Sequence, residues 1–165
     1  MPITMIEPVA QAILDELAAY LPGKIATLQP TFTPVLPMPV PTEYVYGHSD
    51  FLRGFPVVQV DPVRLPMLNE DVRWQDHEKR IELGLFVTDV ARANLARLLD
   101  RYARCLLETL AERRKDSAFL QAGRNFDLVF KGEEIDYGST FPQSGQFLRA
   151  LFIPMRATRR DVEFH

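Results

Sequence analysis

The stretch KRIELGLFVTDVARANLARLLDRYARCLLETLAERRKD, residues 79–116, holds the two strongest structural patterns of the chain. Its first part alternates apolar residues with others, which is typical of a half-buried β-strand. The side expected to face the core holds Ile81, Leu83, Leu85 and Val87. Its second part repeats apolar residues every three or four positions and so predicts a long amphipathic helix. The helical stripe consists of Leu95, Leu98, Leu99, Tyr102, Leu106 and Leu110.

The flanking sequence adds a second helix and three more strands. Residues 4–21 are amphipathic at helical spacing, and Pro22 and Gly23 predict the end of that helix. The β-rich runs at 55–60, 126–130 and 145–157 predict strands. Because helices and strands do not alternate strictly, the expected class is α+β. We expect a mainly antiparallel four-stranded sheet with two helices packed on one face, plus an extended proline-rich arm.

The proline-rich arm contains the stretch PTFTPVLPMPVPTEYVYG, residues 30–47. Each proline removes a backbone donor and favours extended geometry in the residue before it, which excludes a helix or a central strand. We therefore expect one α+β domain over residues 1–165, with 24–47 as an extended arm and 61–79 and 131–145 as long loops.

The apolar side chains of the arm form the first candidate interaction site. They are Phe32, Val35, Leu36, Met38, Val40 and Tyr44. One interpretation is that they pack along the protein's own surface. The other is that they dock on a neighbouring subunit, because a stiff, polyproline-like segment loses little conformational freedom on binding.

The sequence has no motif for catalysis or for a cofactor. There is no Walker pattern, no GxGxxG after a strand and no GxSxG. His48, His77 and His165 are not spaced as metal ligands on a helix are. Asp76 and His77 are neighbours, but we interpret them as solvated loop residues. We therefore expect no enzyme activity, no metal and no cofactor.

Charge and composition exclude some further classes. A formal net charge of −3 argues against a protein whose whole surface binds nucleic acid. Cys105 is the only cysteine and cannot form an internal disulfide, so we expect a packed thiol in a reducing compartment. The start of the chain lacks a basic n-region, and no run approaches the length of a membrane span. We expect a protein located in the cytoplasm or assembled there.

Arginines on the long helix form the second candidate site. Arg97, Arg101 and Arg104 fall on the face opposite the apolar stripe, with acidic residues interspersed. A mixed-charge helix face is usually solvated. Contact with a polyanion such as DNA and a polar subunit interface or ring lumen are the other two interpretations.

The order of these elements and the sequences of three of them resemble those of a known family. GFPVVQV ahead of the charged strand RIELGLFVTD, followed by the helix with RYARCLLETL, is similar to the tail terminator or tail-completion (neck) proteins of tailed bacteriophages. That resemblance implies a structural virion protein that forms a ring, commonly a hexamer, at the head-proximal end of the tail. It implies assembly in the host cytoplasm, contacts with the tail tube protein and the head connector, and passage of DNA without sequence specificity. It implies no catalytic activity, cofactor, membrane contact or small-molecule substrate.

Three alternatives to this function stay open at the level of sequence. The chain can be another connector or adaptor ring protein of the phage neck. It can be a small bacterial ligand-binding module, in which loops 61–79 and 131–145 surround the ligand. An enzyme built on Asp76 and His77 is the third.

Overall fold

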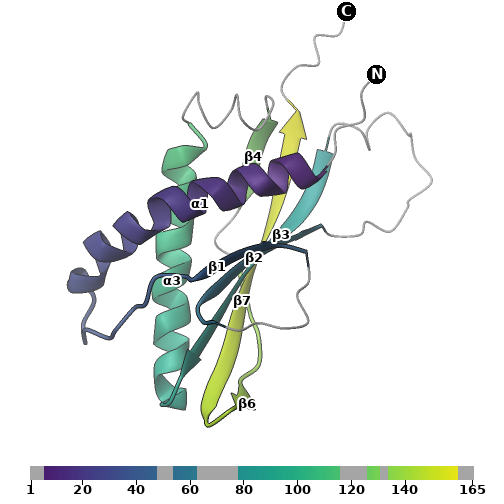
Figure 1. Cartoon of the computed structure of the whole chain (residues 1–165). Helices are drawn as coiled ribbons and strands as arrows, with labels where there is room; N and C mark the ends of the chain where they lie inside the picture. The colour runs from purple at the N-terminus through teal and green to yellow at the C-terminus, as the bar shows by residue number, and fades with distance from the viewer. Residues whose placement is uncertain (1–5, 48–53, 63–77, 116–125, 131–133, 160–165) are drawn as a thin grey trace, which may run out of the picture.

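Two long helices and a seven-stranded sheet make up the described part of the chain, in which the α+β class is confirmed (Figure 1). The computed structural model describes residues 6–47, 54–62, 78–115, 126–130 and 134–159. The elements in chain order are α1 (Ile6–Leu28), the 3-10 helix η1 (Gln29–Thr31), β1 (Glu43–Tyr46), β2 (Val57–Pro62), β3 (Glu78–Asp89), α3 (Arg92–Arg113), β4 (Phe126–Phe130), β5 (Asp136–Tyr137), β6 (Phe141–Gln143) and β7 (Gln146–Arg159).

The strands are ordered β1-β2-β3-β7-β4, and β5 and β6 also pair with β7. The sheet is mixed, because β1 runs parallel to β2 with Glu43 opposite Val57, while the other pairs are antiparallel. The prediction of a mainly antiparallel four-stranded sheet is therefore wrong. Strands β1, β5 and β6 have four, two and three residues. Runs this short are hard to recognise because they do not complete a clear alternation.

The predicted loop 131–145 contains two of these short strands, so its described part is not an irregular loop. β6 and β7 form a hairpin closed by Ser144 and Gly145, both with positive φ, at 47° and 80°. Two such residues fit a type I′ turn, which matches the twist of the flanking strands. Of the predicted loop 61–79, Asp61 and Pro62 belong to β2 and 78–79 to β3. Residues 63–77 lie outside the described part.

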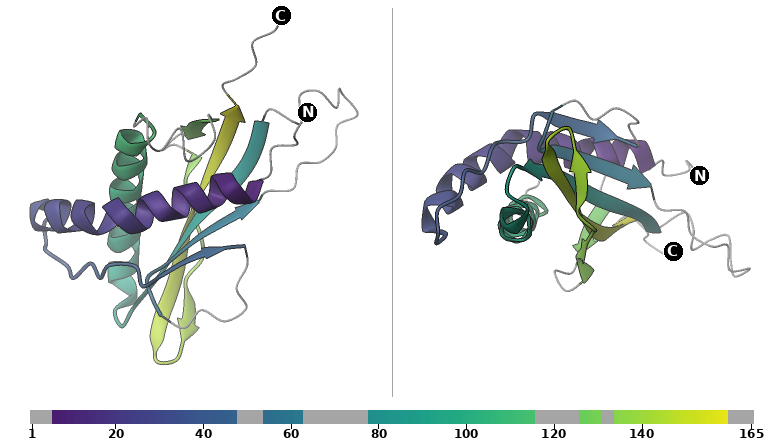
Figure 2. Two further views of the ribbon diagram at one scale, coloured as in Figure 1. Left: turned by 45° about the horizontal axis from the view of Figure 1, so that its top comes forward. Right: turned by 90° about the horizontal axis from the view of Figure 1, so that it is seen from below.

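One face of the sheet forms the core with both helices (Figure 2). The predicted alternation in β3 is confirmed, since the four residues expected to face the core are at most 2% exposed. In the register, Leu83 faces Ile153 and Leu85 faces Leu151 on β7. The buried residues of α3 include the predicted stripe: Leu95, Leu98, Leu99, Tyr102, Leu106 and Leu110.

Helix α1 continues through Pro22 to Leu28, so its predicted end at residue 21 is wrong. Ile25 is 2% exposed and Leu28 is also buried, and they extend the apolar stripe by two turns. Burial of these side chains outweighs the cost of a proline and a glycine inside the helix. The predicted arm 24–47 is shortened accordingly. Residues 24–28 are helical and 43–46 form β1, which leaves 32–42 as the extended segment, called the arm from here on.

The long helix α1 lies across α3, and ionic contacts join the two (Figure 1). Glu16 pairs with Arg113, and Lys24 pairs with Glu112. The Arg113 guanidinium also stacks over the ring of Tyr20, with 3.8 Å from Cζ to the ring centroid. The crossing fixes where α1 ends and therefore where the arm begins.

Candidate interaction surface

The arm runs from the end of α1 across α3 to β1, and its inward-facing residues pack on their own subunit (Figure 1). Met38 is 4% exposed, and Phe32, Leu36 and Tyr44 are partly buried against the core. The Tyr102 hydroxyl of α3 donates a hydrogen bond to the Pro39 carbonyl oxygen. For these four candidate interface residues, packing on the own surface is what the structure shows.

The remaining two candidates on the arm point outward. Val35 is 64% exposed and Val40 is 42% exposed, in contrast to Met38 between them. Because an extended chain directs neighbouring side chains to different sides, anchoring through some residues presents the others to the outside. We call Val35 and Val40 the arm ridge.

A second exposed apolar pair lies at the end of the sheet where β7 begins. Val90 directly follows β3 and is 72% exposed, and Phe141 of β6 is 59% exposed. They share this end of the sheet because Asp89 pairs with Phe147, and Phe141 pairs with Leu148. We call Val90 and Phe141 the hairpin patch, which the sequence patterns did not single out.

The two sets of candidate residues predicted from sequence meet in one pocket of about 380 Å³. Its lining residues are Phe32, Thr33, Arg97, Asp100, Arg101 and Arg104. The prediction that all three arginines lie on an open helix face is wrong for Arg101, which is 7% exposed. Phe32 of the arm covers it, with 5.1 Å between the Arg101 Cζ and the ring centroid. Arg97 and Arg104 are exposed at the same pocket.

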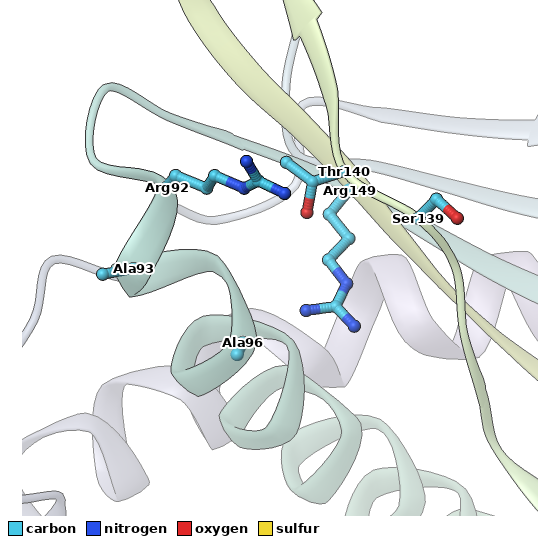
Figure 3. Close-up of a pocket in the computed structure, with 6 residues that line it drawn as sticks. All are labelled: Arg92, Ala93, Ala96, Ser139, Thr140 and Arg149. Carbon is cyan, nitrogen blue, oxygen red and sulfur yellow. The ribbon is translucent and has the colours of Figure 1, made fainter.

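A larger and more open pocket, of about 700 Å³, lies between the start of α3 and the strands β5 to β7 (Figure 3). It is lined by Arg92, Ala93, Ala96, Ser139, Thr140 and Arg149. Figure 3 shows the guanidinium groups of Arg92 and Arg149 extending into the space between the helix and the strands. Arg149 is held in place, because its Nε donates to the Gly138 carbonyl oxygen at 2.7 Å. No motif predicts this site, since tertiary folding alone brings its residues together.

Several buried or partly buried groups of α3 and β1 are held in their neutral form. Burial, and then the nearby Glu108, raise the pKa of the Cys105 thiol to about 11. Cys105 is fully buried, so the prediction of a packed thiol is confirmed. Burial also raises the pKa of Tyr44 to about 12 and raises the pKa of Tyr102. None of these groups is poised to act as a nucleophile near neutral pH.

Within the described ranges, no group of three or more His, Cys, Asp or Glu side chains is arranged to hold a metal ion. Asp76 and His77 lie outside the described residues, as do His48 and His165. None of the described helices combines the length and the apolar character that crossing a membrane requires.

No model of a known protein family matches this sequence, and a search of curated proteins found no match. The resemblance to phage tail terminator proteins therefore stays a prediction.

Proposed function

We propose that this chain is a structural virion protein that forms a ring at the head-proximal end of a phage tail and joins the tail tube to the head connector. The proposal includes a ring of identical subunits, commonly six by the resemblance, without catalytic activity. DNA would pass through the ring without being read. The order of elements in the sequence supports this proposal, and the α+β fold is of the class that it requires.

The observation that carries the proposal is the presence of two separate exposed apolar surfaces on one subunit. A ring with cyclic symmetry is built from head-to-tail contacts, in which one surface of a subunit meets a different surface of the next. The arm ridge lies beside α3, and the hairpin patch lies at the end of the sheet where β7 begins. Since Met38 and the Pro39 carbonyl group already fix the arm, the ridge is ordered before any partner arrives, which lowers the cost of association.

The proposal is tested by measuring mass with light scattering and by imaging the purified protein, alone and mixed with tail tube protein. We expect rings in at least one of these conditions. The double variants Val35→Ser/Val40→Ser and Val90→Ser/Phe141→Ser should each abolish rings while leaving the melting temperature nearly unchanged. The matched control is Ala18→Ser/Ala26→Ser, at two exposed positions of α1, and it should still form rings.

Mixing the two defective variants gives a sharper result. A head-to-tail interface predicts that one intact ridge and one intact patch form a dimer that cannot close into a ring. Full rings from the mixture would rule out this pairing of surfaces. A protein that stays monomeric in every condition, indifferent to tube protein, would rule out the proposed function.

A further inference from the structure

The Arg101 side chain holds a buried guanidinium nitrogen that has no hydrogen-bond partner among the described residues. It is 7% exposed, and its Nη1 is buried with no hydrogen-bond partner in the described part of the chain. A guanidinium group stays charged in proteins, so Arg101 cannot relieve this situation by losing a proton. Buried polar groups are normally paired, because an unpaired buried donor is costly, and a charged one more so. An unpaired guanidinium group at a pocket therefore indicates a partner that comes from outside.

The groups around Arg101 do not supply the missing hydrogen-bond acceptor. The Phe32 ring stacks near the guanidinium group, but its face offers no hydrogen-bond acceptor in the plane of the nitrogen atoms. Arg104 lies over the same ring at 5.8 Å and is already paired, with its Nε donating to Glu108 at 2.8 Å. Asp100 is exposed at the pocket and accepts a long hydrogen bond from Tyr137. What is missing is a hydrogen-bond acceptor for the Arg101 Nη1 atom.

We propose that the Arg101 pocket binds the carboxylate of one acidic side chain from a partner polypeptide. A carboxylate matches the planar fork of a guanidinium group, with which it forms two parallel hydrogen bonds. A pocket of about 380 Å³ is at the small end of ligand pockets and has room for an acidic side chain. The proposal goes beyond the proposed ring, because it concerns any acidic peptide that reaches this pocket.

A nucleic acid backbone fits the pocket less well than an acidic side chain. A second phosphate beside the one at Arg101 would meet the carboxylate of Asp100, which lines the same pocket and repels it. The Phe32 ring also lines the pocket and lies near the guanidinium groups of Arg101 and Arg104. The site therefore favours one isolated negative charge over a polyanion.

The test is a titration of the wild-type chain with a short capped peptide that contains one glutamate among glycines and serines. The readout is the Nε–H signal of Arg101 in a nitrogen-15 correlation spectrum. We expect this signal to shift saturably, with a dissociation constant in the millimolar range, and about tenfold weaker binding of the same peptide with glutamine. Equal binding of the two peptides, or no saturable shift up to about 20 mM peptide, would overturn the proposal.

Variants test whether the peptide binds at Arg101. Variants without Arg101 lack its Nε–H signal, so binding to them is followed through the backbone amide signals of Thr33 and Asp100, which line the pocket. Arg101→Gln should lose at least about tenfold in affinity for the glutamate peptide, and Arg101→Met is the second variant, because its apolar chain keeps the contact with Phe32. Arg92→Gln removes an equal charge outside the pocket and should leave the affinity within about twofold. A single-stranded oligonucleotide is the last arm of the experiment. If it shifts the Thr33 and Asp100 amide signals at lower concentration than the peptide does, and Arg101→Gln removes those shifts, the site binds phosphate and the proposal is wrong.

Discussion

The β3–α3 unit and the arm lie against each other, but different forces give them their conformations. In β3 and α3 every second or every third to fourth residue is apolar, and the resulting stripes are buried together. The arm has no such period, and separate contacts hold it. They include the side chains of Met38 and Leu36, the stacking of Phe32, and hydrogen bonds at the carbonyl oxygens of Leu36 and Pro39 and at the Thr42 amide. The unit is thus stable through many redundant contacts, and the arm depends on a few that can be removed one at a time.

The largest effect is expected in the β3–α3 unit. Leu99 is fully buried in the centre of α3, so Leu99→Ala should lower the free energy of unfolding by about 2–5 kcal/mol. Ala96→Ser, at an exposed position of the same helix, is the control and should change it by less than about 0.5 kcal/mol. Denaturant unfolding measures both. A small loss for Leu99→Ala would mean that the core is not organised around α3.

A rise in pH tests both the β3–α3 unit and the strand β1 that follows the arm, because Cys105 of α3 and Tyr44 of β1 each have a raised pKa. The folded state holds the proton of Cys105 more tightly than the unfolded state does, since burial raises its pKa from 9.0 to about 11. The resulting stabilisation is complete below pH 9 and is lost as pH rises toward 11. For Tyr44, in β1 directly after the arm, the corresponding window is pH 10 to 12. We expect Cys105 alone to lower the free energy of unfolding by on the order of 2 kcal/mol between pH 9 and 11, and Tyr44 and Tyr102 to add to this loss above pH 10.

The variant Tyr44→Phe separates the contribution of Tyr44 to the pH dependence from those of Cys105 and Tyr102. Unfolding experiments at pH 8, 9.5 and 11 should give parallel losses in the wild type and in this variant up to about pH 10. Above that pH the variant should lose less, because it lacks the phenol. Identical curves at every pH would show that Tyr44 contributes nothing to the pH dependence of the free energy of unfolding.

Anchoring of the arm gives the next effect. Met38→Ser exposes an apolar pocket and should cost about 2 kcal/mol, less than a central core residue of the same size because the arm can shift. Val35→Ser, three positions earlier and 64% exposed, should cost less than about 0.5 kcal/mol. Thermal unfolding of the two variants tests the comparison directly. Equal losses would mean that the arm does not have one buried and one outward-facing side.

The contrast between these regions also explains what the sequence can predict. The β3 strand and the α3 helix follow from periodicity alone, because their apolar residues repeat over many positions. Pro22 and Gly23 predict a helix end that is too early, although Ile25 and Leu28 continue the apolar stripe. Burial of these two side chains exists only in the folded chain, and it outweighs the low helix propensity of proline and glycine. The parallel pairing of β1 with β2 is a long-range contact, which no local pattern encodes.

The candidate site likewise divides into features that local sequence patterns predict and features that depend on long-range contacts. Sequence patterns identified the arm side chains and the helix arginines, but as two independent sets. Their meeting at Phe32 and Arg101 depends on how the arm crosses α3, and this crossing follows from α1 ending at Leu28. An arginine spaced for the solvated face of a helix is therefore buried by a segment about 70 positions away in sequence, for which composition and spacing hold no signal.

The smallest effect is expected for the single hydrogen bond between the two regions. Tyr102→Phe removes the hydroxyl that donates to the Pro39 carbonyl oxygen and leaves the ring in the core. We expect a loss of about 0.5–1.5 kcal/mol, the usual net contribution of one such bond, measured by denaturant unfolding. Because this bond fixes the arm rather than the core, the variant should also speed amide exchange at the non-proline residues 33, 35, 36 and 38 while leaving β3 unchanged. Faster exchange in β3 as well would show that the arm and the β3–α3 unit unfold together, which contradicts the division drawn between them.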